Sequence, residues 1–256
     1  MNLNRAGANL HYEIHGSGPA ILLSHGYSAT LEMWRGQIAP LSQRHQLILW
    51  DMRGHGQTDS PGDPSAYSED ATVEDMAALL DNAKAGADRA IVGGLSLGGY
   101  MSLAFHLRYP QRVRALLLFD TGPGFKNDEA RAAWNRRAEE TANTFETQGL
   151  ASLQSRSREM AMSTHRSAAG LARAARGMLA QRDASVIKSL PDIKVPTLII
   201  VGADDAPFLA PTDYMAAKIP NARKVVIPHA GHASNLDQPE MFNQAVLEFL
   251  ESTHLS

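Results

Sequence analysis

The stretch Gly93–Tyr100 reads GGLSLGGY, with four glycines around the single serine Ser96. It follows the apolar run Ala90–Val92, which is typical of a buried strand, and it opens a segment with the apolar spacing of a helix. The stretch therefore predicts a strand, a sharp turn that carries the serine, and a helix.

The four glycines have different predicted roles. A serine on such a turn takes a strained backbone conformation, so the residues two positions away must be small. Gly94 and Gly98 occupy those two positions. We expect Gly93 and Gly99, one residue further out on either side, to permit close packing of the strand and the helix.

The same alternation of strand and helix extends over most of the chain. Segments of helical period separate the apolar runs, and we predict one helix over Thr72–Ala85, with Thr72 as its N-cap, and a closing helix over Pro239–Leu250. Strand, helix, strand, repeated, predicts an α/β fold with a mostly parallel sheet covered on both faces. The other predicted strands lie in Leu10–Ile14, Ala20–Gly26, His45–Trp50, Ala115–Phe119, Val195–Gly202 and Ala222–Pro228.

The pattern changes between residues 122 and 190, where no strand-like run occurs. This segment holds 11 Lys and Arg against 7 Asp and Glu, whereas the whole chain has a formal net charge of -3. We predict a helical cap inserted at 122–190 into a core formed by 1–121 and 191–256. Solvated charged faces on amphipathic helices are the alternative explanation of the positive charge.

Composition excludes several classes of protein. The chain has no cysteine, so disulfides and thiolate chemistry are excluded, and it has no basic tail that would indicate nucleic-acid binding. No secretory signal and no apolar run long enough for a membrane helix are present, so we expect no membrane association and a cytoplasmic location. The oligomeric state, monomer or homodimer, is left open.

Five motifs occur in an order that resembles the α/β-hydrolase fold superfamily. They read LLSHGYSAT, LILWDMRGHGQTDSP, GGLSLGGY, VGADDAPFLAP and GHASNLDQPEMF, and they span nearly the whole sequence. The chain is similar to capped serine hydrolases of this superfamily, in particular carboxylesterases and 3-oxoadipate enol-lactonases. The resemblance implies the α/β-hydrolase fold, with a helical cap and a nucleophile, acid and histidine in that order along the chain.

The resemblance also implies roles for individual residues. A serine hydroxyl needs a base to take its proton and an acid to orient that base. By resemblance, Ser96 is the nucleophile and His232, one of ten histidines, is the base. The family's Gly-x-x-Asp spacing, counted from Gly202, favours Asp205 as the acid and leaves the adjacent Asp204 as the alternative.

Two further loops match family motifs. His25–Gly26 resembles the oxyanion loop, which implies that the backbone N–H groups of Tyr27 and Leu97 stabilise a developing oxyanion. We also expect the Tyr27 ring to line the acyl pocket. We expect His25 to order this loop. In the motif that begins at Asp51, we expect Asp51 and Arg53 to hold loops together through hydrogen bonds.

The predicted activity is hydrolysis of a small-molecule carboxylic ester or lactone through an acyl-enzyme on Ser96, with no cofactor and no metal. Serine in the turn argues against the haloalkane dehalogenases and epoxide hydrolases of this fold, which use a carboxylate nucleophile. Carbon-carbon bond hydrolases, cofactor-free haloperoxidases, some acyltransferases or amidases, and non-catalytic ligand receptors remain as alternatives. The nine arginines in 122–190, among them Arg136 and Arg137, also suggest an anionic substrate, the alternative being that they face water.

Overall fold

The computed structural model describes residues 1–83, 89–153 and 157–255. Eight strands form one sheet in the order β1-β2-β4-β3-β5-β6-β7-β8. β1 and β2 pair antiparallel with their neighbours, and β3 to β8 run parallel. The bounds of the strands are β1 Asn2–Arg5, β2 Ala8–His15, β3 Ala20–Ser24, β4 Gln46–Trp50, β5 Ala90–Leu95, β6 Val113–Phe119, β7 Thr197–Gly202 and β8 Ala222–Ile227.

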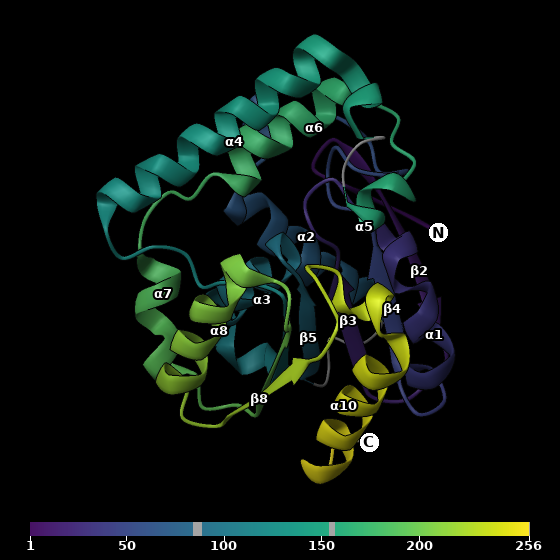
Figure 1. The fold of residues 1–256 in the computed structure, drawn as a ribbon. Coiled ribbons are helices and arrows are strands. Elements are labelled where there is room, and N and C mark those ends of the chain that lie inside the picture. The colour runs from purple at the N-terminus through teal and green to yellow at the C-terminus, as the bar shows by residue number, and fades with distance from the viewer. Residues whose placement is uncertain (84–88, 154–156, 256) are drawn as a thin grey trace.

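Helices cover both faces of the sheet, which confirms the predicted α/β architecture (Figure 1). Parallel neighbours require long crossover connections, and the helices occupy those connections. Their bounds are α1 Arg35–Leu41, α2 Glu69–Asn82, α3 Leu97–Arg108, α4 Asp128–Gln148, α5 Arg158–Ala161, α6 Ala168–Ala174, α7 Ser185–Ser189, α8 Ala206–Lys218, α9 Ser234–Asp237 and α10 Pro239–Ser252.

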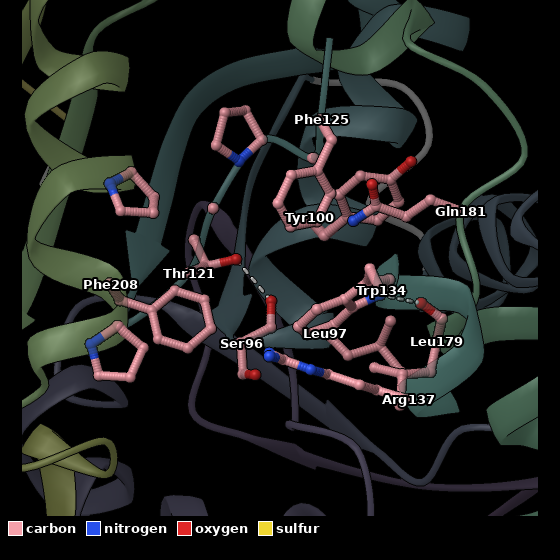
Figure 2. Close-up of a pocket in the computed structure, with 15 residues that line it drawn as sticks. Ser96, Leu97, Tyr100, Thr121, Phe125, Trp134, Arg137, Leu179, Gln181 and Phe208 are labelled. Carbon is pink, nitrogen blue, oxygen red and sulfur yellow. Dashed lines mark hydrogen bonds between the residues drawn. The ribbon is translucent and has the colours of Figure 1, made fainter. Parts of the chain in front are cut away.

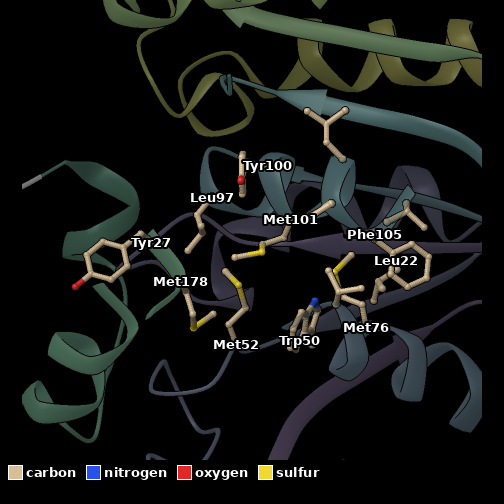
Figure 3. Close-up of a cluster of buried hydrophobic side chains, with 14 of the residues drawn as sticks. Leu22, Tyr27, Trp50, Met52, Met76, Leu97, Tyr100, Met101, Phe105 and Met178 are labelled. Atoms are coloured by element: carbon tan, nitrogen blue, oxygen red, sulfur yellow. The ribbon is translucent and has the colours of Figure 1, made fainter. Parts of the chain in front are cut away.

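Two apolar cores lie on opposite faces of the sheet. Neighbouring residues of one strand belong to different cores, as Ile21 and Leu22 do, because successive side chains of a strand point to opposite faces. In Figure 3, Met76 of α2 and Phe105 of α3 pack with Leu22 on one face. On the other face, α1 and α10 cover the sheet, and Phe242 of α10 contributes to that core. The parallel strands β3 to β7 are therefore buried on both sides, whereas the edge strand β8 is partly exposed.

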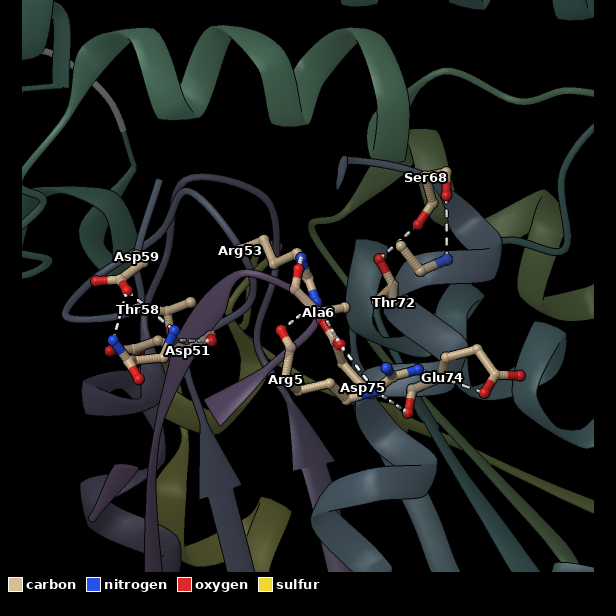
Figure 4. Close-up of polar contacts among 12 residues, drawn as sticks. Arg5, Ala6, Asp51, Arg53, Thr58, Asp59, Ser68, Thr72, Glu74 and Asp75 are labelled. Carbon is tan, nitrogen blue, oxygen red and sulfur yellow. Dashed lines mark hydrogen bonds and ion pairs between the residues drawn. The ribbon is translucent and has the colours of Figure 1, made fainter. Parts of the chain in front are cut away.

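The start of α2 differs from the prediction. Ser68, not Thr72, is the N-cap, because the Ser68 hydroxyl accepts a hydrogen bond from the Ala71 N–H at 3.0 Å. Thr72 lies inside the helix and donates its hydroxyl to the Ser68 carbonyl at 2.8 Å (Figure 4). The predicted end of this helix at Ala85 lies outside the described residues.

Buried polar contacts fix the loop after β4. The Asp51 carboxylate accepts hydrogen bonds from the N–H groups of Leu31 at 2.8 Å and Gln57 at 2.9 Å. Arg53 forms a bidentate pair with Asp75 of α2, at 2.6 and 2.8 Å (Figure 4). Asp51 and Arg53 therefore hold loops together as predicted, and this loop supports the edge of the sheet where the candidate site lies.

Helices α4 to α7 form an insertion between β6 and β7. Within the described part of residues 122–190, the chain has no strand. The Asn127 side chain caps α4 by accepting from the Ala130 N–H, and Ala138, Ala142 and Phe145 form the buried stripe of this helix. In Figure 1, α4 and α6 lie together over one end of the molecule, above the carboxyl ends of the parallel strands. The insertion therefore covers the edge of the sheet that carries Ser96.

Candidate active site

Ser96 occupies a strained turn between β5 and α3. Its backbone has φ 55° and ψ -115°, a conformation that costs a non-glycine residue roughly 1–3 kcal/mol. Two hydrogen bonds hold the Ser96 backbone in this conformation. The Ser96 N–H donates to the Phe119 carbonyl at 2.9 Å, and the Thr121 hydroxyl donates to the Ser96 carbonyl at 2.6 Å. Figure 2 shows this second contact at the floor of the pocket. The end of β6 thus holds Ser96 in place.

The glycines around Ser96 leave room for the backbone of neighbouring segments as well as for the serine. A Cβ on Gly98 would lie 2.1 Å from the Ser24 carbonyl oxygen, and one on Gly94 would lie 2.6 Å from the Gly98 carbonyl carbon. A Cβ on Gly93 would lie 2.5 Å from the Leu117 carbonyl oxygen of β6. The β5–α3 turn therefore packs directly against the ends of β3 and β6, and it needs small residues for that reason.

His232 and Asp205 are hydrogen-bonded to one another. The Nδ1 atom of His232 lies 2.8 Å from Asp205 Oδ2, across 27 residues of sequence. Asp205 is buried, whereas the adjacent Asp204 is exposed. The His232 ring stacks on Phe208, with ring centroids 4.8 Å apart, and Phe208 lines the same pocket as Ser96. Of the two aspartates that the sequence left open, the structure pairs Asp205 with the histidine.

The surroundings of His232 favour its protonated form. Burial lowers the pKa of this imidazole, but the hydrogen bond to Asp205 and the charges of Asp205, Asp120 and Glu159 outweigh burial and raise the pKa above its ordinary value of 6.5. The described residues contain no hydrogen bond between the Ser96 hydroxyl and His232, and in unliganded enzymes such contacts are often long. The structure thus shows the pair of His232 and Asp205, and a contact between His232 and the Ser96 hydroxyl stays a prediction.

Buried contacts of His25 hold the predicted oxyanion loop in place. His25 is fully buried, and its Nε2 accepts a hydrogen bond from the Met52 N–H at 2.9 Å. Burial lowers the pKa of His25 to about 3, so the ring is neutral and orders the loop, as expected. Leu97 is the first residue of α3, where a backbone N–H has no partner within its own helix. The predicted donors Tyr27 and Leu97 thus belong to two fixed backbone segments.

The Tyr27 ring does not take its predicted place in the acyl pocket. It packs against Phe145 of α4 and His55, and its hydroxyl donates to the Leu171 carbonyl of α6 at 2.8 Å. Because its ring and hydroxyl contact the insertion, Tyr27 does not line the pocket beside Ser96. This part of the prediction was wrong, because the resemblance concerned only the backbone of that loop.

A pocket of about 310 Å³ opens beside Ser96 (Figure 2). Its walls are mostly apolar and come from α3, the loop after β6, the insertion and the start of α8. Arg137 and Gln181 are polar exceptions in the walls. The lining residues are Ser96, Leu97, Tyr100, Thr121, Gly122, Pro123, Gly124, Phe125, Trp134, Arg137, Leu179, Gln181, Pro207, Phe208 and Pro211. A volume of this size suits a small organic molecule.

Within the described ranges, no group of three or more His, Cys, Asp or Glu side chains has a geometry that would hold a metal ion. No helix in that part of the chain is long and apolar enough to span a membrane.

The profile of the alpha/beta hydrolase family matches residues 21–245, which is most of the chain. The chain belongs to the alpha/beta hydrolase family. It has the fold of that family, with a helical insertion between β6 and β7.

Relatives of this alpha/beta hydrolase are named for different activities. It is 31% identical to a putative 2-succinyl-6-hydroxy-2,4-cyclohexadiene-1-carboxylate synthase from Bacillus subtilis, over 95% of this chain and 96% of the relative. It is 29% identical to 3-oxoadipate enol-lactonase 1 from Acinetobacter baylyi, over 98% and 97% of the two chains. The solved esterase from Thermogutta terrifontis is 31% identical, with a TM-score of 0.81 over 96% of this chain and 94% of that one.

Sequence reasoning missed Asp120, at the end of β6. Its side chain is buried and accepts hydrogen bonds from the Gly202 N–H at 2.8 Å and from the Ser234 hydroxyl. Asp120 thus links the strand before Asp205 to the segment after His232. Burial raises the pKa of Asp120 to about 7. Its position at the end of a buried strand, at the same sheet edge as Ser96, was the available signal.

Proposed function

We propose that this alpha/beta hydrolase is a serine hydrolase that cleaves a small carboxylic ester or lactone through an acyl-enzyme on Ser96. One observation carries the proposal. Ser96 sits on a strained turn at a pocket whose wall, Phe208, stacks on a histidine already hydrogen-bonded to a buried carboxylate. A nucleophile, a base and an orienting acid around one pocket suit acyl transfer.

In the proposed first half-reaction, Nε2 of His232 takes the proton of the Ser96 hydroxyl as Oγ attacks the substrate carbonyl. Asp205 accepts the Nδ1–H hydrogen bond, which sets the tautomer and stabilises the imidazolium that forms. The tetrahedral intermediate then collapses, and His232 gives its proton to the departing alkoxide. In a lactone this alkoxide stays attached to the acyl group.

In the second half-reaction, His232 takes a proton from water as that water attacks the acyl-enzyme. Collapse of the second tetrahedral intermediate releases the carboxylic acid and returns the proton to Ser96. We propose that the backbone N–H groups of Tyr27 and Leu97 donate to the oxyanion in both halves. One donor of this kind is worth about 10²- to 10³-fold in rate.

The proposal also concerns the substrate and the insertion. The relatives named as an esterase and an enol-lactonase support ester or lactone cleavage. We propose that residues 122–190 act as a cap that shapes the pocket over a core of residues 1–121 and 191–256. The apolar lining suits a substrate that is apolar next to its reacting carbonyl.

A substrate panel on wild type and Ser96→Ala tests the proposal. The panel holds short p-nitrophenyl esters, lactones, ring-fission diketones, and peroxide with a halide acceptor. Wild-type turnover of esters or lactones that Ser96→Ala lacks would support the proposal. Exclusive turnover of the diketones would favour carbon-carbon cleavage. Ligand binding with no turnover of any substrate would favour a receptor.

A further inference from the structure

Arg137 is the one formally charged side chain among the described residues that line the pocket. It extends from α4, and in Figure 2 its guanidinium points from the wall toward Ser96. Its neighbour Arg136 is also exposed but does not line the pocket. Two adjacent arginines on one helix thus have different surroundings.

The guanidinium of Arg137 has no hydrogen bond or ion pair with any residue in the described ranges. Other arginines of the insertion do have acidic partners: Arg131 pairs with Asp128, and Arg176 pairs with Glu139. A guanidinium presents a planar set of donors that matches a carboxylate. Arg137 therefore presents a positive charge to any ligand in this mostly apolar pocket.

Gln181 supplies a second, independent observation. The residue is 8% exposed, and its Oε1 atom has no hydrogen-bond partner in the described part of the chain. Two hydrogen bonds with Asn135 of α4 fix its backbone at the wall, at 2.8 and 2.9 Å. A buried polar atom without a partner is uncommon in native structures and calls for an explanation. Rotation of the amide would present its two N–H donors to a ligand oxygen.

We propose that Arg137 and Gln181 form a carboxylate subsite, so that the substrate is an ester or lactone that also carries a carboxylate. The guanidinium pairs with the two carboxylate oxygens, and the Gln181 amide donates to one of them. This inference rests on the proposed function, because Ser96 defines where the reacting carbonyl lies. The apolar walls then hold the carbon chain between the two groups.

Matched esters test the subsite. Mono-p-nitrophenyl glutarate carries a terminal carboxylate, and the corresponding glutaramate carries an uncharged amide of the same shape. A second pair places the carboxylate or amide on the phenol instead, which distinguishes the acyl side from the alcohol side. Wild type should prefer the charged member of at least one pair in kcat/KM. Because charge-assisted hydrogen bonds would be lost, Arg137→Gln should lower the charged-to-neutral ratio about 10- to 100-fold.

Arg136→Gln is the matched control, and it should leave the ratio unchanged. Arg137→Lys should restore part of the preference, since it keeps the charge but not the planar fork. Salt should lower the rate on the charged ester more than the rate on the amide. A ratio near one in wild type, or the same ratio in the Arg136 and Arg137 variants, would overturn the subsite.

A binding measurement separates this inference from the proposed function. Ser96→Ala and the double variant with Arg137→Gln are titrated with mono-p-nitrophenyl glutarate in a calorimeter. Tighter binding by the protein that keeps Arg137 would support the subsite even if wild type turned over no ester, in which case the hydrolase proposal fails. Equal binding by both proteins, with normal turnover of neutral esters by wild type, would overturn the subsite and leave the hydrolase proposal standing.

Discussion

Replacement of Asp120 by asparagine should stabilise this protein at alkaline pH relative to wild type. The Asp120 carboxylate accepts from the Gly202 N–H and the Ser234 hydroxyl, and burial raises its pKa to about 7. Asparagine has nearly the same shape, and its amide can accept from Gly202 while it donates to Ser234. The substitution therefore removes the buried charge and keeps both contacts.

The sign and size of the effect follow from proton linkage. A carboxyl whose pKa is higher in the folded state binds more protons there, so its contribution to stability is largest at low pH and disappears as the pH rises through the folded pKa. With a pKa of about 7 folded and 3.8 unfolded, that contribution falls by about 2 to 3 kcal/mol between pH 5 and pH 8. The asparagine variant has no such contribution to lose.

Urea unfolding at pH 5 and pH 8 measures the effect, because other titrating groups largely cancel in the difference between variant and wild type. Relative to wild type, the free energy of unfolding of the Asp120→Asn protein should rise by about 2 to 3 kcal/mol between the two pH values. The control Asp204→Asn removes an exposed carboxylate from the same edge of the sheet and should keep a constant difference. A constant difference for Asp120→Asn as well would refute the raised pKa.

Three further predictions concern the candidate site. His232 must be neutral to take a proton, and its pKa is raised, so kcat/KM should rise with pH with a midpoint above 6.5; a flat profile from pH 5.5 to 8.5 would count against histidine as the base. Asp205→Asn should lower kcat about 10³- to 10⁴-fold and Asp204→Asn less than about 2-fold, and equal losses in steady-state assays would contradict the assignment of the acid. Gly98→Ala should cost at least about 1 to 3 kcal/mol in thermal unfolding, because its Cβ would lie 2.1 Å from a carbonyl oxygen. Gly62→Ala, whose Cβ would meet nothing within 4 Å, should be nearly neutral, and a Gly98→Ala protein of wild-type stability would refute the packing argument.

The sheet could be predicted from the sequence because its signals are local. Apolar runs such as Ala20–Ser24 are short and uninterrupted. The predicted closing helix is also found, and five apolar residues at helical spacing form its buried face: Phe242, Ala245, Val246, Phe249 and Leu250. The N-cap of α2 also has a local signal, but the prediction placed it at Thr72 and the structure has Ser68. Ser68 is followed by Glu69 and Asp70, and acidic residues in the first turn favour a helix start there.

Other features depend on contacts between distant segments. Asp120 meets Gly202 and Ser234 across 82 and 114 residues, so no pattern near Asp120 indicates its partners. The sequence also does not indicate whether Arg136 or Arg137 lines the pocket, because this depends on how α4 packs on the core. Local sequence patterns therefore predict the strands, the helices and the turn that carries Ser96. Which charged side chains lie near that turn depends on contacts between distant segments.

The most direct test of the proposed nucleophile is covalent labelling. Wild-type protein is treated with a fluorophosphonate, digested and analysed by mass spectrometry, beside Ser96→Ala and His232→Gln. We predict one label per chain on the peptide that contains Ser96, no label in Ser96→Ala, and much slower labelling in His232→Gln. Absence of a label in wild type, a label on another residue, or an equal rate in His232→Gln would contradict a serine nucleophile activated by this histidine.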